Sequence, residues 1–151
     1  MPAFTLDSNC LVAAVCTWHE HHQTVADDIE TRLRRRERLV VVAQTLVEAY
    51  AVLTRLPAPH RLAPADAWAL LEANFVRRRS LTALQARAYA RLLDDLARQE
   101  VGGGRTYDAL IAECARLGGA AHLVTFNRRH FDPPPVGLLV VEPGDGRPRL
   151  T

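Results

Sequence analysis

Four short polar side chains stand where a strand or a loop runs into a helix: Asp7, Glu48, Asp108 and Asn127. Three carboxylates and one amide gathered at one end of a small α/β sheet would form a pocket of oxygen ligands. Carboxylates that lie close together repel one another unless a cation joins them, and hard oxygen donors suit Mg²⁺ or Mn²⁺. The set therefore indicates metal-assisted cleavage of a phosphodiester bond.

Each of these side chains also has a structural interpretation that needs no chemistry. Asp7 can cap the helix that follows it, and Asp108 can favour the dipole of a helix from its first turn. Glu48 fits a capping box with Thr45, because the T-x-x-E spacing returns the glutamate to the cap. Asn127 can close a turn through its own backbone. Only their joint placement favours a shared site.

Strands and helices alternate along the chain with short connections between them. Apolar runs predict strands at residues 4–6, 39–43, 122–125 and 138–141. Apolar stripes and helix-ending residues predict helices at 8–15, 24–36, 45–56, 65–77, 83–99 and 107–117. This order predicts a three-layer α/β/α fold with a mainly parallel central sheet. We expect one domain over residues 1–142, followed by a tail at 143–151.

The predicted strands give the polar residues a common location. Asp7, Glu48 and Asn127 each follow a strand within a few residues. In open α/β sheets, ligands bind beyond the carboxyl ends of the strands. We therefore expect these side chains to meet at that edge of the sheet.

Composition restricts the class of enzyme. At 151 residues and 48% hydrophobic content, the chain can bury a core as a single domain. All 19 basic residues are arginine, and arginine holds two phosphate oxygens at once. Phosphoryl-accepting receiver domains and dehalogenase-type phosphatases also carry acids after a first strand. They usually need a lysine on the phosphoryl group, so the lack of lysine disfavours both.

Cysteine usage and hydropathy indicate an ordinary intracellular protein. The three cysteines show no CxxC spacing, and Cys10 and Cys114 fall in apolar stretches, which predicts buried free thiols. The chain begins without a secretory pattern. Its apolar runs are shorter than the ~20 residues that cross a bilayer. We expect a cytoplasmic protein that does not enter a membrane.

Taken together, these motifs resemble the PIN-domain ribonucleases, in particular the VapC toxins of bacterial VapBC toxin–antitoxin pairs. FTLDSNCLVA is similar to the family's opening strand with its first acid, Asp7, and LVEAYAVLTR to the helix with the second acid, Glu48. The most specific segment is GGRTYDALIAECARLGGAAHLVTFNRRHF, which carries Asp108, Asn127 and a final aromatic, Phe131. Many relatives have an acid where this chain has neutral Asn127.

The resemblance implies a metal-dependent endoribonuclease with a PIN-like fold and a role for each polar residue. Asp7 and Asp108 would hold Mg²⁺ or Mn²⁺, directly or through its waters. Glu48 would orient the attacking water, and Asn127 would add a neutral oxygen ligand. This assignment makes all four residues part of the catalytic site.

Further residues would support that site. The hydroxyls of Ser8 and Thr125 are candidates to hold the carboxylates in place by hydrogen bonds. Arg105, Arg128 and Arg129 border the motifs and are candidates to hold RNA phosphates beside the pocket.

The resemblance also implies partners. Family members are held inactive by a small antitoxin, and the substrate is RNA, which the motifs do not assign to tRNA, rRNA or mRNA. A homodimer is the default assembly. Two alternatives stay open: a non-catalytic binding module whose acidic pocket receives an arginine from a partner, and a stand-alone RNA-processing nuclease.

The histidines carry less information. His19, His21 and His22 form an H-x-H-H loop without a fourth ligand nearby, which favours a solvated or half-buried loop over a zinc site. His130 lies close to the motifs in sequence, and packing or hydrogen bonding is its simplest role, with a minor RNA contact as the alternative.

Overall fold

The central element of the computed structural model, which describes residues 2–145, is a five-stranded sheet with the order β3-β2-β1-β4-β5. Every neighbouring pair of strands is parallel. The strands are β1 (Ala3–Leu6), β2 (Arg38–Val42), β3 (Leu81–Thr82), β4 (His122–Val124) and β5 (Leu139–Val141). The predicted parallel sheet is therefore confirmed, and all its carboxyl ends meet at one edge.

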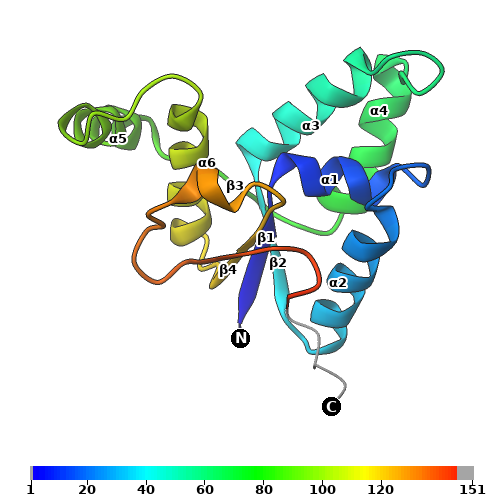
Figure 1. Cartoon of the computed structure of the whole chain (residues 1–151), viewed down its shortest axis with the longest axis horizontal. Helices are drawn as coiled ribbons and strands as arrows, with labels where there is room; N and C mark the ends of the chain where they lie inside the picture. The colour runs from blue at the N-terminus through cyan, green and yellow to red at the C-terminus, as the bar shows by residue number, and fades with distance from the viewer. Residues whose placement is uncertain (1, 146–151) are drawn as a thin grey trace.

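Helices cover both faces of this sheet. They are α1 (Ser8–Val15), α2 (His22–Arg34), α3 (Ala43–Arg55), α4 (Pro64–Leu71), α5 (Ala86–Arg98) and α6 (Arg105–Leu117), with a π-helical turn η1 (Glu72–Val76) and a 3-10 turn η2 (Arg128–Phe131). Figure 1 shows α1 to α4 on one side of the sheet and α6 on the other, while α5 projects at the edge of the molecule. The predicted three-layer α/β/α arrangement is confirmed.

Side chains of alternate strand residues pack into two separate hydrophobic cores. On one face, Phe4 and Val41 pack with the apolar sides of α1 to α4. On the other face, Val42 and Leu123 pack with α6, including Ile111. Both faces of β1 and β2 are thus buried, which is why these strands read as continuous apolar runs and not as alternating ones.

One glycine marks the closest approach of a helix to the sheet. Gly118 ends α6, and a Cβ at this position would lie 2.7 Å from Cγ1 of Val40 on β2. Any side chain here would push α6 away from the sheet. Glycine therefore allows the carboxyl end of α6 to lie close to β2.

Several element boundaries differ from those predicted. Thr45 is not a helix cap: α3 begins at Ala43, and the Thr45 hydroxyl donates to the Val42 carbonyl oxygen at 2.7 Å. The capping box with Glu48 is therefore wrong. Helix α2 begins two residues before the expected Thr24, and it ends at Arg34.

Further differences lie between residues 64 and 99. The helix predicted at 65–77 is divided into α4 and the π-helical turn η1, and α5 begins at Ala86 instead of residue 83. The two-residue strand β3 precedes α5 and was not predicted. It is too short to show any sequence periodicity.

The remaining expectations concern cysteines, membranes and the chain end. Cys10, Cys16 and Cys114 are free and buried, and burial raises the pKa of all three thiols. Within the described part of the chain, no helix has the length and apolar character needed to cross a bilayer. The tail predicted at 143–151 lies, from residue 146, outside the described residues.

Candidate functional site

Asp7 is the best-anchored acid of the site. It follows β1 directly, caps α1, and is only 6% exposed. Its Oδ1 accepts the backbone N–H of Ser8 at 2.8 Å, and its Oδ2 accepts the hydroxyl of Thr125 at 2.8 Å. The capping interpretation and the ligand interpretation of Asp7 are therefore compatible, since the same carboxylate serves both.

Parallel pairing of β1 with β4 creates the contact between Asp7 and Thr125. The backbone N–H of Asp7 donates to the Val124 carbonyl oxygen at 2.9 Å, so the residues that follow the two strands lie side by side. Thr125 is fully buried. Its hydroxyl also accepts the backbone N–H of Asn127 at 3.0 Å, which joins the β4–η2 turn to the acid.

One asparagine side chain contacts this carboxylate, and a second asparagine is joined to it through Thr125. Asn127 has an exposed side chain at the start of η2, where its backbone carbonyl accepts the N–H of His130 at 3.0 Å. Asn9 was missed as a site residue, although it stands within the opening motif. Its Nδ2 lies 3.4 Å from Oδ2 of Asp7, and its buried Oδ1 has no hydrogen-bond partner in the described part of the protein.

The other two acids come from helices on opposite faces of the sheet. Glu48 lies in the second turn of α3, where its Oε1 accepts Nε2 of Gln44 at 3.3 Å. Asp108 lies in the first turn of α6, as predicted, with 21% of its side chain exposed. The amino-terminal halves of α3 and α6 thus carry both acids toward the edge where β1 and β4 end.

Electrostatic effects indicate that the three acids lie near enough to influence one another. Burial raises the pKa of Asp7, and the charge of Glu48 raises it further against the hydrogen bonds from Thr125 and Ser8. Burial also raises the pKa of Asp108, followed by the charge of Asp7. Repulsion among these carboxylates would be relieved by a bound cation.

His130 belongs to the site, which sequence reasoning did not foresee. Its Nδ1 lies 3.9 Å from Oδ2 of Asp108, and its charge lowers the pKa of both Asp7 and Asp108. More than half of its side chain, 58%, is exposed. The pairing depends on the η2 turn, whose geometry the sequence does not reveal.

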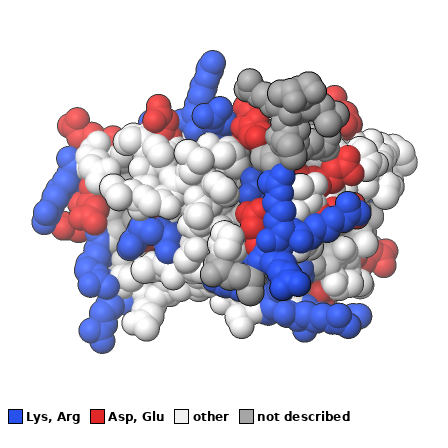
Figure 2. Space-filling view, turned by 90° about the horizontal axis from the view of Figure 1, so that it is seen from below, with Lys and Arg blue, Asp and Glu red and all other residues white. Residues whose placement is uncertain are grey.

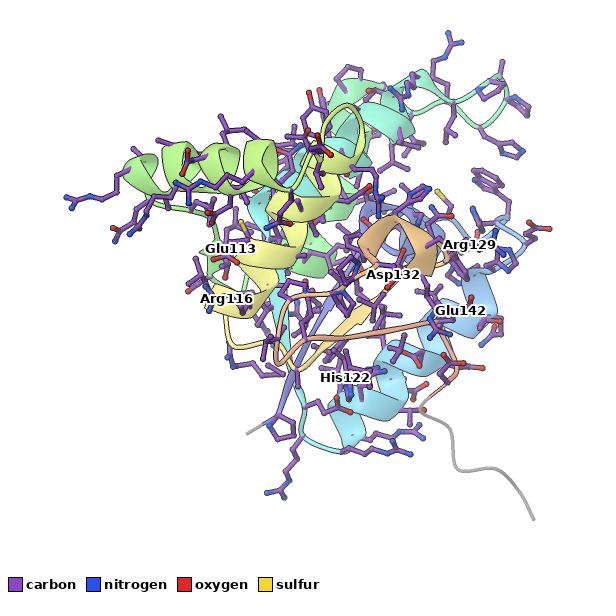
Figure 3. All side chains as sticks on the ribbon, turned by 60° about the vertical axis from the view of Figure 1, so that its left-hand side comes forward. Glu113, Arg116, His122, Arg129, Asp132 and Glu142 are labelled. Carbon is purple, nitrogen blue, oxygen red and sulfur yellow. The ribbon has the colours of Figure 1, made fainter. Side chains whose placement is uncertain are left out.

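The predicted arginines surround the pocket at different positions. Arg105 opens α6, its charge lowers the pKa of Asp108, and its Nη2 donates to the Asp132 carbonyl oxygen at 2.7 Å. Arg128 and Arg129 are exposed on η2 and line a hollow beside it. Figure 3 shows Arg129 and Asp132 on this turn, far from His122 at the opposite end of the sheet.

Histidine and acidic side chains do not form a complete metal cage by themselves. Among residues 2–145, no three His, Cys, Asp or Glu side chains group closely enough to hold an ion. The zinc interpretation of the H-x-H-H loop is thereby disfavoured, and Nδ1 of His22 instead lies 2.8 Å from the Ala13 carbonyl oxygen. For Asp7 and Asp108, water and substrate oxygens would have to complete any coordination shell.

Comparisons with known proteins agree with this arrangement. The family model described as PIN domain matches residues 4–134. Ribonuclease VapC40 of Mycobacterium tuberculosis is 43% identical over 115 residues, 76% of this chain and 79% of that protein. Ribonuclease VapC27 of the same organism is 36% identical over 120 residues, 80% and 74% of the two chains. A DNA-bound VapBC crystal structure from Salmonella typhimurium superposes with a TM-score of 0.65 at 26% identity, covering 94% and 98%.

Proposed function

The chain belongs to the PIN domain family, and from this premise we propose that it is a metal-dependent endoribonuclease acting as the toxin of a toxin–antitoxin pair. Its relatives at 43% and 36% identity are named as VapC ribonucleases. Those names disfavour the non-catalytic binding module and leave the nuclease as the better interpretation.

One observation carries the proposal: a buried carboxylate, Asp7, whose pKa is raised by burial and by the charge of Glu48. A cap needs only backbone donors, so burial beside another acid is not required for the capping role of Asp7. Here its direct partners are the neutral donors Thr125 and Ser8. Acids with raised pKa values that cluster at a ligand-binding edge are typical of active sites.

The donor set fits Mg²⁺ or Mn²⁺. Mg²⁺ binds through one or two carboxylates, keeps several waters and takes substrate phosphate oxygens, so it does not need a three-residue cage. Asp7 and Asp108 would hold the ion, with Asn127 as a neutral oxygen donor. The unpartnered, buried Oδ1 of Asn9 adds a further oxygen near Asp7. When bound, the ion would supply positive charge at the scissile phosphate and lower the pKa of an attacking water.

The chain's own residues would supply orientation and charge. Thr125 fixes the rotamer of Asp7 through its 2.8 Å bond, and Glu48 would orient the attacking water from α3. Arg128 and Arg129, exposed on η2, would hold backbone phosphates. Arg105 would do the same from the start of α6.

A cognate antitoxin would hold the enzyme inactive. The Salmonella typhimurium structure that resembles this chain is a VapBC complex. A basic segment of a VapB-like partner would be attracted to the pocket by the same carboxylates that hold the metal. A homodimer of the toxin is the expected assembly within such a complex.

Cleavage by purified protein tests the proposal directly. The chain, freed of any partner, should cut RNA in the presence of Mg²⁺ or Mn²⁺ and stop when EDTA is added. Cleavage that continues undiminished in EDTA would reject the metal-dependent mechanism. Expression of the chain alone should arrest growth, and co-expression of the neighbouring antitoxin frame should restore it.

A further inference from the structure

Five planar rings form a row on the surface beside the proposed catalytic pocket. The row runs through Phe126, His21, His19, Trp18 and His60. Successive ring centroids are 4.6, 5.7, 5.8 and 3.9 Å apart, and the last pair is stacked at 19° between planes. Three separate segments contribute: the β4–η2 turn, the α1–α2 loop and the α3–α4 loop.

Most of this row is outside the two cores. Trp18 is 46% exposed, the side chain of His21 is 46% exposed, and His60 is exposed as well. Phe126 is half-buried and packs against the core on the α1–α4 face, which anchors one end. A large aromatic ring that stays accessible on a loop does little for folding and is typical of a binding surface.

The loop that carries the row is held in place by separate bonds. The backbone N–H of His21 donates to Nδ1 of His19 at 3.1 Å, and Nδ1 of His22 lies 2.8 Å from a backbone carbonyl oxygen of α1. Glu20, the acid within the loop, is 82% exposed and lies 3.2 Å from His21. Ordered, exposed rings are a preformed surface, so little conformational entropy is lost when a ligand stacks on them.

The row begins at the proposed active site. Phe126 stands between Thr125, which holds Asp7, and Asn127 at the start of η2. The hollow lined by Phe126 and Asn127 also includes Arg128 and Arg129. A strand whose phosphates lie on these arginines would therefore have its neighbouring bases close to the first rings.

Flat rings suit bases that are not paired. Unstacked bases of single-stranded RNA bind on aromatic and histidine rings, whereas bases within a duplex are hidden from such contacts. Burial, followed by the charge of His21, lowers the pKa of His19. Its ring is therefore neutral near pH 7 and offers a π-face instead of a charge.

We propose that the ring row Phe126–His21–His19–Trp18–His60 is a stacking platform for unpaired nucleotides of the RNA substrate. This inference rests on the proposed ribonuclease function, and it adds the class of RNA that the site accepts. Single-stranded segments or loops would lie along the row and lead into the acidic pocket. A fully paired duplex would be a poor ligand.

Binding to a cleavage-deficient protein tests the platform without depending on catalysis. In the Asp108→Asn background, a short unpaired oligoribonucleotide should bind more tightly than the same sequence annealed to its complement. Trp18→Ala should weaken binding of the unpaired form by about tenfold, as expected for the loss of one stacked base. Trp18→Phe should restore most of it. Tyr89→Ala is the matched control, because Tyr89 is 42% exposed on α5 and lies outside the row.

Fluorescence of Trp18 tests the platform in a chain that keeps this residue, so the result does not depend on whether Trp18→Ala folds. The chain has two tryptophans, so Trp68→Phe leaves Trp18 as the only indole reporter. Titration with the unpaired oligoribonucleotide should quench this fluorescence as bases stack on the ring. The duplex should quench it much less.

Three results would overturn the platform. One is equal binding of unpaired RNA by Trp18→Ala and its parent in the Asp108→Asn background, and another is unchanged Trp18 fluorescence at saturating RNA. The third is loss of antitoxin affinity, but not RNA affinity, in Trp18→Ala, which would assign the row to the partner. If the unsubstituted chain cleaves RNA in any of these cases, the ribonuclease proposal survives while the platform fails. An unsubstituted chain that neither binds nor cleaves RNA would refute both.

Discussion

Charged side chains are buried at both ends of the sheet, but among the described residues arginine balances their charges by direct ion pairs only at the amino end. At the amino end, Nε of Arg32 donates to Oδ2 of Asp28 at 2.8 Å, and its Nη1 donates to Oε1 of Glu37 at 3.0 Å. These side chains are 6%, 3% and 10% exposed, so a cation and two acids satisfy one another inside the protein. At the carboxyl end, the charge of Glu48 raises the pKa of Asp7, and the charge of Asp7 raises the pKa of Asp108, in both cases after the larger effect of burial.

This difference separates a structural charge cluster from the cluster that we propose to be functional. A buried acid that serves the fold has a cation and further donors around it; Oδ1 of Asp28 also accepts the backbone N–H of Gly144 at 2.9 Å. A buried acid in an active site instead lies in an environment that disfavours its ionised form, and a bound cation can remove this penalty. Figure 2 shows the face at the amino end, where arginine side chains gather with acidic ones between them. The following substitutions test this comparison.

The largest effect is expected at the carboxyl end of the sheet, where Asp7 and Asp108 lie. Asp108→Asn should lower RNA cleavage on the order of a thousandfold, because it removes an anionic metal ligand worth several kcal/mol in the transition state. Single-turnover cleavage of RNA at saturating Mn²⁺ measures it. Asp95→Asn is the control, since Asp95 lines the same hollow from α5 but is exposed. Equal activity of both variants would remove Asp108 from the site.

Substitutions at the amino end of the sheet should change the free energy of unfolding but not the rate of RNA cleavage. Arg32→Met leaves Asp28 and Glu37 buried without their cation, which should cost about 3 kcal/mol of unfolding free energy. Arg34→Met is the matched control on the same helix: its ion pair with Glu30 is 75% exposed on the arginine side, and its loss should cost about 0.5 kcal/mol or less. Urea unfolding measures both. Cleavage per folded molecule should not change, and a loss in Arg32→Met would contradict the separation.

Two buried hydroxyls, one at the carboxyl end and one inside the sheet, distinguish support of the acid from general packing. Thr125→Val removes the donor to Asp7 and should lower cleavage about tenfold or more, as expected when a ligand's outer hydrogen bond is lost. Thr5→Val removes an equally buried hydroxyl that donates to the Val40 carbonyl oxygen at 2.6 Å, away from the acids. It should reduce stability and leave cleavage per folded molecule intact. If the two variants lose activity equally, Thr125 acts through packing.

The same aspartate-to-asparagine change should have opposite signs at the two ends. In the metal-free protein, a raised pKa means that Asp7 favours the fold fully below its unfolded pKa, and this contribution is lost as pH rises through the folded pKa. Asp7→Asn, which keeps a good helix cap, should therefore raise Tm at pH 7 by about 2 to 4 °C, an effect near 1 kcal/mol, and give little gain near pH 3.

Asp28→Asn, by contrast, should lower Tm at pH 7, because it breaks the charge pair with Arg32. Thermal unfolding of both variants in EDTA at pH 3 and pH 7 gives the comparison. A fall in Tm for Asp7→Asn at pH 7 would show that its carboxylate stabilises the empty site.

The smallest effect is expected at Asn127. Asn127→Asp adds a fourth negative charge to the pocket and should tighten Mn²⁺ binding several-fold. Asn127→Ala should lower cleavage less than Asp108→Ala does. Calorimetric titration of Mn²⁺ into the parent and Asn127→Asp decides the point. Equal or weaker affinity in the aspartate variant would mean that this exposed side chain does not reach the metal.

Sequence predicted the parts of this fold and site that local chemistry determines. Helix α1 has the predicted bounds, because Asp7 supplies its cap and apolar residues fill its buried side. Thr125 was named as a candidate hydroxyl for holding a carboxylate, and it donates to Asp7, since parallel pairing of β1 and β4 makes neighbours of the residues that follow them. The roles of these residues in catalysis stay predictions.

Features set by tertiary contact escaped prediction. Strand β3 exists because Leu81 and Thr82 pair with the end of β2, and two residues carry no pattern of their own. His130 approaches Asp108 through the η2 turn, and the ring row forms across three loops. Thr45 resembled a helix cap in sequence, but α3 already begins at Ala43 as β2 ends.

The hydrogen bond between Asp7 and Thr125 also determines when Asp7 can be positioned during synthesis of the chain. It joins residues 118 positions apart, and β1 stays unpaired with β4 until His122–Val124 have been made. At about 5 to 20 residues per second, a ribosome needs roughly 6 to 24 s to cover that interval. During that interval the growing polypeptide carries Asp7 without the residue that positions it. The proposed nuclease site therefore stays incomplete on the ribosome for as long as residues 8 to 125 are being added.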